Sequence, residues 1–192
     1  MKPMCRERVL EAATRSFLDR GYRSSIDGIA ARAGVAKQSV YDHFASKDQL
    51  FEDVARGLSQ HVLVALREPG HEPLRATLTR FALAYRRRAL GAQGIAIFRA
   101  LVPEVPRFRA LARSMFAASA GETQRRLAAR LAMAMAAGEL RRDDPGFAAE
   151  MLLGMLVGQE RMKRLFGVPR GRTAQARRAG QIVDCFLRAY RP

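Results

Sequence analysis

The 192-residue sequence is poor in the side chains that build metal centres and catalytic sites. Its two cysteines, Cys5 and Cys185, lie far apart and lack the paired spacing of a zinc site or a disulfide framework. Its three histidines, His43, His61 and His71, do not stand in the context of a catalytic triad. The motifs GxxxxGK, HExxH and GxSxG are absent as well. We therefore expect a protein that is not an enzyme and that has neither a metal ion nor a cofactor.

Long apolar runs are also missing. No uninterrupted apolar stretch reaches 18 residues, which argues against a membrane-spanning helix. The first residues, MKPMCRERVLEAA, become charged at once and have no apolar central region, so we expect no secretory signal. Together with the low cysteine content, these features fit a reduced, cytoplasmic location.

Acidic residues are scarce relative to basic ones. The chain has 34 Lys and Arg residues against 18 Asp and Glu residues, a formal net charge of +16. Such an excess favours a polyanionic partner, nucleic acid first and an anionic membrane surface second. Residues 1–56 carry 10 basic and 8 acidic side chains, whereas residues 57–192 carry 24 and 10. A bias toward Arg on solvated helix faces explains this distribution as well as a functional basic surface does.

Apolar residues recur at helical spacing along almost the whole chain, and we find neither an alternating strand pattern nor a repeat of fixed period. The hydrophobic content of 48% is sufficient for a proper core. Pro69-Gly70 is the clearest break in the pattern. The sequence predicts an all-α protein of about nine helices. We expect a helix-turn-helix domain over residues 1–56 and a helical ligand-binding and dimerisation domain over residues 57–192.

The last two predicted helices are apolar on more than one face. Phe147, Met151 and Met155 point in one direction, and Leu152 and Leu156 point in another. A monomer can bury one of these stripes in its own core and leave the other for a partner helix. This pattern predicts a homodimer with a two-fold interface made by the last two helices.

Residues 24–44 have the pattern of two short helices joined by a tight turn. Ser24 or Ser25 can cap the first helix, and Gly34 can take positive φ at the turn. Ala30 is small where the helices would cross, and Val40 can anchor the second helix, Lys37 to Phe44, in the core. A second helix whose inner face is anchored in the core can present its outer face to the major groove of DNA. Its outward positions are Lys37, Gln38, Ser39, Tyr41, Asp42 and His43.

Residues 6–56 closely resemble the N-terminal DNA-binding domain of the TetR/AcrR family of transcriptional regulators. The motifs that carry the resemblance are Phe17…Gly21-Tyr22, Ile29-Ala30…Ala33-Gly34-Val35, Val40-Tyr41…His43-Phe44 and Ser46-Lys47…Leu50-Phe51. Three positions depart from the family pattern. The loop before the second helix is one residue shorter, Gly28 replaces a better helix former, and Gln38 stands where a small Gly is common.

The second part of the chain resembles the AefR-like C-terminal domain of the same family, through PEVPRFRALARSMF, AAGELRRDDPGFAAEMLLGMLVGQ and IVDCFLRAY. The resemblance implies a homodimer whose interface is made by the last two helices. It also implies a pocket for a small-molecule inducer inside the C-terminal domain. Candidate lining residues are Phe81, Tyr85, Phe98, Met115, Phe116, Met155, Gln159 and Met162, because Met and aromatic side chains adapt to bulky apolar ligands. Core packing explains the same residues equally well.

The family pattern also implies roles for individual DNA-binding residues. Tyr41 and Lys47 would contact phosphates, and Ser25 would add a hydroxyl contact near the start of the second helix. The expected base readers are Lys37, Gln38, Ser39 and His43, since Gln suits adenine and Lys suits guanine. Asp42 would repel phosphate, so we expect it to read cytosine or to orient His43.

The resulting hypothesis is a ligand-responsive, sequence-specific repressor. It would bind double-stranded DNA at a near-palindromic operator as a homodimer, without a membrane partner, and a small-molecule inducer would release it. One alternative keeps the fold but makes the protein an activator, or a regulator without a small ligand. Another is a non-specific architectural DNA binder or membrane-surface protein that uses its Arg-rich C-terminal part.

Overall fold

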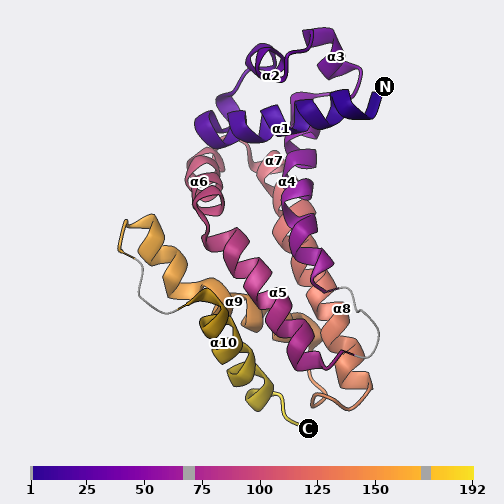
Figure 1. The fold of residues 1–192 in the computed structure, drawn as a ribbon, viewed down its shortest axis with the longest axis vertical. Coiled ribbons are helices and arrows are strands. Elements are labelled where there is room, and N and C mark those ends of the chain that lie inside the picture. Colours follow the sequence, from indigo (N-terminus) through magenta and orange to yellow (C-terminus); the bar gives the residue numbers. More distant parts are fainter. Residues whose placement is uncertain (1, 67–71, 170–173) are drawn as a thin grey trace. The chain divides into compact units, whose positions relative to one another are not determined.

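A computed structural model describes residues 2–66, 72–169 and 174–192, and all regular structure in these ranges is helical (Figure 1). The prediction of an all-α protein is therefore confirmed. The α-helices are α1 (Lys2–Arg20), α2 (Ile26–Ala33), α3 (Lys37–Tyr41), α4 (Lys47–Val64), α5 (Leu74–Leu90), α6 (Ala92–Leu101), α7 (Arg109–Phe116), α8 (Glu122–Ala136), α9 (Pro145–Leu165) and α10 (Gln175–Ala189). Within the described ranges, no helix is both long and apolar enough to cross a membrane. The predicted break at Pro69-Gly70 lies outside the described residues.

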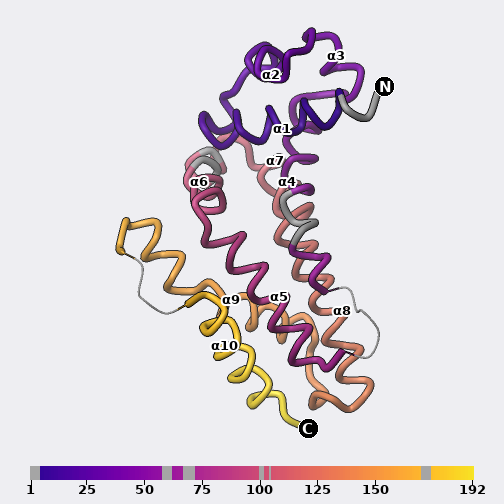
Figure 2. The backbone as a smooth tube through the Cα atoms, in the orientation of Figure 1, coloured from indigo at the N-terminus to yellow at the C-terminus, as the bar shows by residue number. Residues whose placement is uncertain are grey.

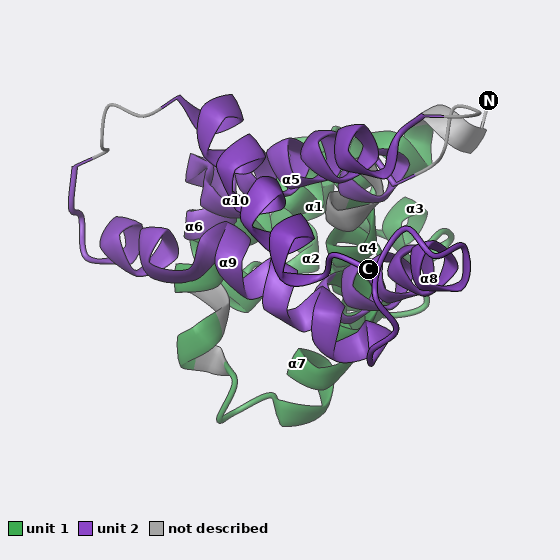
Figure 3. Ribbon diagram, turned by 90° about the horizontal axis from the view of Figure 1, so that it is seen from below, with its two compact units in different colours: residues 1–58, 96–119 green, residues 59–95, 120–192 purple. Residues whose placement is uncertain are grey.

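The chain divides into two compact units (Figure 3). Unit 1 comprises residues 1–58 and 96–119, and unit 2 comprises residues 59–95 and 120–192. The backbone passes from one unit to the other within α4, within α6 and at the short π-helical turn Ala117–Gly121, as the trace in Figure 2 allows the reader to follow. This turn joins α7 to α8 in the sequence.

Unit 1 is built around a core shared by α1, α2, α3 and the start of α4. Phe17 of α1 and Phe51 of α4 meet edge to face, with ring centroids 4.5 Å apart. Leu111 and Met115 of α7 are buried in the same core. The segment 96–119 therefore packs with the N-terminal helices, although it lies far from them in the sequence.

Unit 2 is a helical bundle in which α5 packs against α9 and α10, and α8 packs against α9. Leu78, Leu131, Leu152 and Phe186 are among its fully buried side chains. Asp144 caps α9 by accepting a hydrogen bond from the backbone N–H of Gly146 at 2.7 Å, with Pro145 in the first helical position.

Helix α9 has two apolar faces, as the sequence predicts. Leu152 and Leu156 are completely buried in unit 2. Phe147 and Met155 remain 56% and 37% exposed, whereas Met151 of the same predicted stripe is half-buried and packs against the core of unit 2. One face of α9 is thus used by the core of a single chain, and the other offers apolar surface beyond that core.

Candidate DNA-binding site

Helices α2 and α3 form the predicted helix-turn-helix. The hydroxyl of Ser25 caps α2 by accepting a hydrogen bond from the backbone N–H of Gly28 at 3.1 Å. Gly34 ends the helix in the left-handed region, with φ of 64°. The N–H of Gly34 donates to the carbonyl of Ala31 at 3.1 Å, and that of Val35 donates to the carbonyl of Ala30 at 3.0 Å. These two bonds satisfy the carbonyls that the end of α2 leaves open, and they fix the turn into α3.

The turn is also held by a residue that the sequence reasoning missed. The guanidinium of Arg8, on α1, donates to the carbonyls of Ala33 at 2.6 Å and Gly34 at 3.2 Å. A Cβ atom on Gly34 would lie only 2.8 Å from Arg8 Nη2. Nothing in the local sequence marks this contact, because the partners are 25 residues apart.

Of the apolar side chains that could anchor α3 in the core, Ile29 and Val40 are buried, whereas Val35 is half-buried and packs against the core. Ile29 and Val40 have no exposed surface, and Ala30 is 3% exposed. Helix α3 itself is shorter than the predicted 37–44, because regular helix ends at Tyr41. Asp42 and His43 follow in a turn that the carbonyl of Val40 closes, by accepting from the N–H of His43 at 3.2 Å.

The predicted DNA-reading side chains of this segment lie outside the core of unit 1. Lys37, Gln38, Tyr41 and Asp42 are exposed, whereas Ser39 and His43 are half-buried. Tyr41 is 43% exposed, so its side chain is accessible to an outside partner. The imidazole of His43 packs edge to face on Phe44.

Two of the expected base readers are held by neighbouring carboxylates. Lys37 Nζ lies 3.0 Å from Asp27 Oδ1 of α2, and this hydrogen-bonded ion pair raises the pKa of the Lys37 ammonium. Gln38 Nε2 donates to Asp42 Oδ1 at 3.3 Å. Asp42 is expected to read cytosine or to orient His43, and its contact with Gln38 is an addition to that prediction. Both pairs are exposed, so they can exchange for contacts to DNA at little cost.

Helix α4 begins with a reciprocal cap. Ser46 Oγ accepts from the N–H of Gln49 at 3.1 Å, while Gln49 Oε1 accepts from the N–H of Ala45 at 2.7 Å. The cap places Lys47 in the first helical position, where the helix dipole and its own charge both favour an anion.

The Lys47 ammonium lies 4.1 Å from the centre of the Tyr22 ring. Burial lowers the pKa of Lys47. The Tyr22 ring also packs at a tilt against Phe51 and edge to face against Phe108, with ring centroids 5.0 Å away in both cases. Its hydroxyl donates to Asp48. The lysine is therefore held at the helix start by an aromatic platform, which the sequence reasoning did not identify.

The residues predicted to line an inducer pocket are divided between the two units. In unit 2, Phe81 is fully buried and stacks on the half-buried Tyr85 with ring centroids 5.8 Å apart. Burial raises the pKa of Tyr85. Met155 and Gln159 line one pocket of about 360 Å³, whereas Met162 is exposed and does not line it. In unit 1, Met115 lies in the core, and Phe98 and Phe116 are exposed by 37% and 60%.

A helix-turn-helix whose first helix, α2, is capped by Ser25, followed by a helical bundle, is typical of a DNA-binding regulator with a separate C-terminal domain. Residues 9–54 match the family model "Bacterial regulatory proteins, tetR family", and residues 76–192 match "AefR-like transcriptional repressor, C-terminal domain". Together these matches show that the chain belongs to the TetR family of transcriptional regulators.

Individual relatives agree with the family match. The solved structure of the flavonoid-responsive regulator FrrA is 30% identical, with a TM-score of 0.77 over 98% of this chain and 97% of that chain. The transcriptional activator FasR of Mycolicibacterium smegmatis is 47% identical over 58 residues, which are 30% of this chain and 25% of FasR. The repressor KstR2 of Mycobacterium tuberculosis is 34% identical over 64 residues, 33% of this chain and 32% of KstR2. The matches to these last two proteins thus span a third of their length or less.

Proposed function

We propose that the protein is a homodimeric repressor that binds a near-palindromic operator and is released from it by a small-molecule inducer. The observation that carries this proposal is the helix-turn-helix, in which buried Val40 fixes a short helix whose polar side chains remain exposed. Regulators of the TetR family bind DNA, generally act as dimers and respond to small molecules. We place its action in the cytoplasm, where a bacterial regulator meets its DNA.

Phosphate contacts would position the protein on the duplex. Tyr41 offers an exposed hydroxyl, and Lys47 offers a cation at the start of α4. Ser25 uses its oxygen to cap α2, so its hydroxyl hydrogen is still available to a phosphate oxygen. Ser25 lies at the start of α2, Tyr41 at the end of α3 and Lys47 at the start of α4.

Base recognition would come from α3 and the turn after it. Lys37, Gln38 and Ser39 lie in the first turn of α3, the part of a recognition helix that reaches base edges. His43 and Asp42 follow the helix and would read the next positions. On binding, Lys37 exchanges Asp27 for guanine, and Gln38 exchanges Asp42 for adenine.

The exposed Phe147 on α9 supports a dimer formed through α9 and α10. Two copies related by a two-fold axis would present their α3 helices about 34–36 Å apart, one turn of DNA. An inducer that binds more tightly to a dimer with a different spacing would lower the affinity for the operator. A difference in inducer affinity between the two dimer conformations is sufficient to release the operator.

The test is footprinting of the purified protein on DNA fragments that it retains from a genomic library of its source. The proposal predicts two protected half-sites related by a two-fold axis and centred about one helical turn apart. A single protected half-site, or protection without symmetry, would contradict the dimeric mode of binding. An inducer is then sought as a compound that releases the footprinted fragment.

A further inference from the structure

Unit 2 contains a pocket of about 360 Å³ between α5, the C-terminal half of α9 and α10. Its wall includes the point where α9 departs from helical geometry, at Gly158 with φ of 12° and ψ of −124°. Because the helix is interrupted there, the carbonyl of Leu156 accepts a hydrogen bond from the guanidinium of Arg86. The interrupted segment of α9 and the buried guanidinium of Arg86 therefore both belong to the pocket wall.

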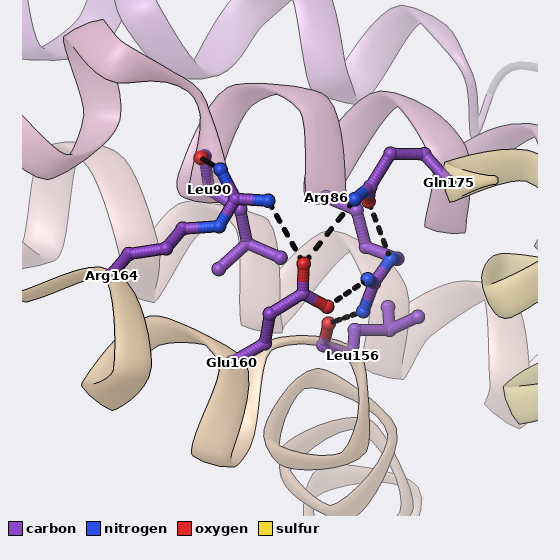
Figure 4. A network of polar contacts seen from close by, with 6 residues as sticks. All are labelled: Arg86, Leu90, Leu156, Glu160, Arg164 and Gln175. Atoms are coloured by element: carbon purple, nitrogen blue, oxygen red, sulfur yellow. Dashed lines mark hydrogen bonds and ion pairs between the residues drawn. The ribbon is translucent and has the colours of Figure 1, made fainter. Parts of the chain in front are cut away.

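Part of the pocket lining belongs to a polar network, which Figure 4 shows: Arg86, Glu160, Arg164 and Gln175. Glu160 lies between Arg86, with which it pairs, and Arg164, whose Nη2 is 2.9 Å from Glu160 Oε1. Arg86 Nε also donates to Gln175 Oε1 at 3.2 Å, and Arg164 Nη1 donates to the carbonyl of Leu90 at 2.6 Å. The one carboxylate of the pocket wall is thus occupied by two guanidinium groups, and Arg86 is only 2% exposed.

The remaining charge of the pocket is positive. Its lining holds four cationic side chains and one carboxylate. With Glu160 committed to Arg86 and Arg164, the cations left over are Lys163 and Arg178, both exposed. Neither forms an ion pair or side-chain hydrogen bond within the described part of the chain. Two such cations at one pocket attract an anion, and they repel each other without one.

The other part of the lining is apolar: Met155, Val157, Val168, Pro169 and Ile182. Met155 is 37% exposed and adaptable in shape, so it can follow the outline of a hydrocarbon group. A pocket with an apolar wall and a few charged groups at one side selects ligands that are apolar at one end and charged at the other.

We propose that this pocket binds an organic anion with an apolar body, its carboxylate or phosphate lying between Lys163 and Arg178. The apolar body lies against Met155 and Ile182. This inference rests on the proposed function, because it assigns the chemical class of the inducer. Met155 and Gln159 are shared with the pocket expected from the sequence, and the cationic residues are new to it.

The proposal is tested by calorimetric titration of the full-length protein with three compounds of equal chain length: octanoate, octyl phosphate and uncharged octanamide. Binding of octanoate or octyl phosphate is expected to be at least about tenfold tighter than binding of octanamide, because charge-assisted hydrogen bonds form only with the anions. The tighter of the two anions tells whether the natural ligand is a carboxylate or a phosphate ester. Equal binding of octanamide, or no binding of either anion, overturns the proposal.

A pair of variants tests the location. Lys163→Gln combined with Arg178→Gln should abolish the preference for the anion. Arg177→Gln removes the neighbouring exposed charge, which does not line the pocket, and should leave the preference intact. If the double variant keeps the preference for the anion, or if Arg177→Gln loses it to the same extent as the double variant, the site is elsewhere. Operator binding without ligand is measured in parallel. Retained operator binding with failed anion binding refutes this inference alone, whereas failed operator binding refutes the proposed function.

Discussion

Among the residues of the DNA-binding unit, Lys47 combines two features that suit a phosphate contact. It is the first residue of α4, and its ammonium lies on the ring of Tyr22, 4.1 Å from the ring centre. The ring limits the conformations of a side chain that is otherwise flexible, so less entropy is lost when a phosphate binds. The proposed contact is therefore partly organised before DNA arrives.

We expect Lys47→Ala to weaken binding to all duplexes by a similar factor. A phosphate contact carries no sequence information, so the slope of log K against log salt should fall by about one. The measurement is a titration by fluorescence anisotropy at several salt concentrations. Lys163→Ala serves as the control, since Lys163 lies in unit 2 and should leave the slope unchanged. An unaltered slope in Lys47→Ala would remove Lys47 from the set of phosphate contacts.

Gln38→Ala should instead relax the preference at one base position. The loss of a bidentate amide contact to adenine is worth about 1–3 kcal/mol of discrimination against the wrong base. The measurement is competition between the operator and variants that carry single base changes. If every base change costs the variant as much as it costs the natural protein, Gln38 does not read a base.

At the scale of elements, the turn between α2 and α3 depends on Gly34. Its φ of 64° suits glycine, and a Cβ there would also meet the guanidinium of Arg8. We expect Gly34→Ala to lower the free energy of unfolding by about 1–2 kcal/mol. Gly57→Ala is the control, because Gly57 lies inside α4 with no atom within 4 Å of an added Cβ, and it should not destabilise the protein. Urea unfolding at equilibrium measures both, and equal stability of the two variants would contradict this account of the turn.

The packing of α9 against α5 depends on the charge of Glu160, which pairs with Arg86 of α5. Partial burial favours the protonated carboxyl, but hydrogen bonds from Arg164, Arg86 and Gln175 outweigh burial and lower the pKa of Glu160 to about 2. A carboxyl whose pKa is lower in the folded state stabilises that state above its ordinary pKa of 4.5. This contribution is lost as the pH falls from about 4.5 toward 2.

Glu160→Gln should therefore destabilise the protein at neutral pH. It leaves Arg86, which is almost fully buried, without a counter-charge, and since Glu160 is one third exposed we expect a loss of about 1–3 kcal/mol. Thermal unfolding at pH 7, 4.5 and 3 measures this. The difference between the variant and the natural protein should shrink as the pH falls through this range. A difference that is constant with pH would show that the charge of Glu160 is not the cause.

The features that the sequence predicted correctly are those encoded locally. Ser25 caps α2, Gly34 ends it, and Val40 is buried, as helix periodicity and capping preferences indicate. The features that it could not predict join distant positions. Arg8 reaches the end of α2 across 25 residues, and Arg86 reaches Glu160 across 74. No local pattern fixes such partners, because they depend on how the helices pack in three dimensions.

At the scale of the whole molecule, the proposed dimer determines how two recognition helices meet DNA. We expect analytical ultracentrifugation to give twice the mass of one chain, which is 21.3 kDa. Phe147→Glu places a charge on the exposed apolar face of α9 and should shift the protein toward monomer. Met133→Glu, on the exposed surface of α8, is the matched control and should leave the dimer intact. Dissociation by both variants, or by neither, would place the interface elsewhere.

Charge is the other property of the whole molecule. The segment 57–192 carries 24 basic and 10 acidic side chains, although the helix-turn-helix lies before it. Ion pairs, such as Arg75 with Asp184 at 2.7 Å, neutralise some of these basic side chains, but the acidic residues are too few to pair with all of them. The rest would attract any polyanion, which is the basis of the alternative of a non-specific architectural DNA binder.

Selection of bound duplexes from a random-sequence pool, at about 0.15 M salt, tests the central claim most directly. The account predicts enrichment of a motif with two-fold symmetry, whose half-sites are centred about one helical turn apart. Retention of DNA without any enriched motif, with binding that falls steeply as salt rises, would contradict it and favour an architectural DNA binder.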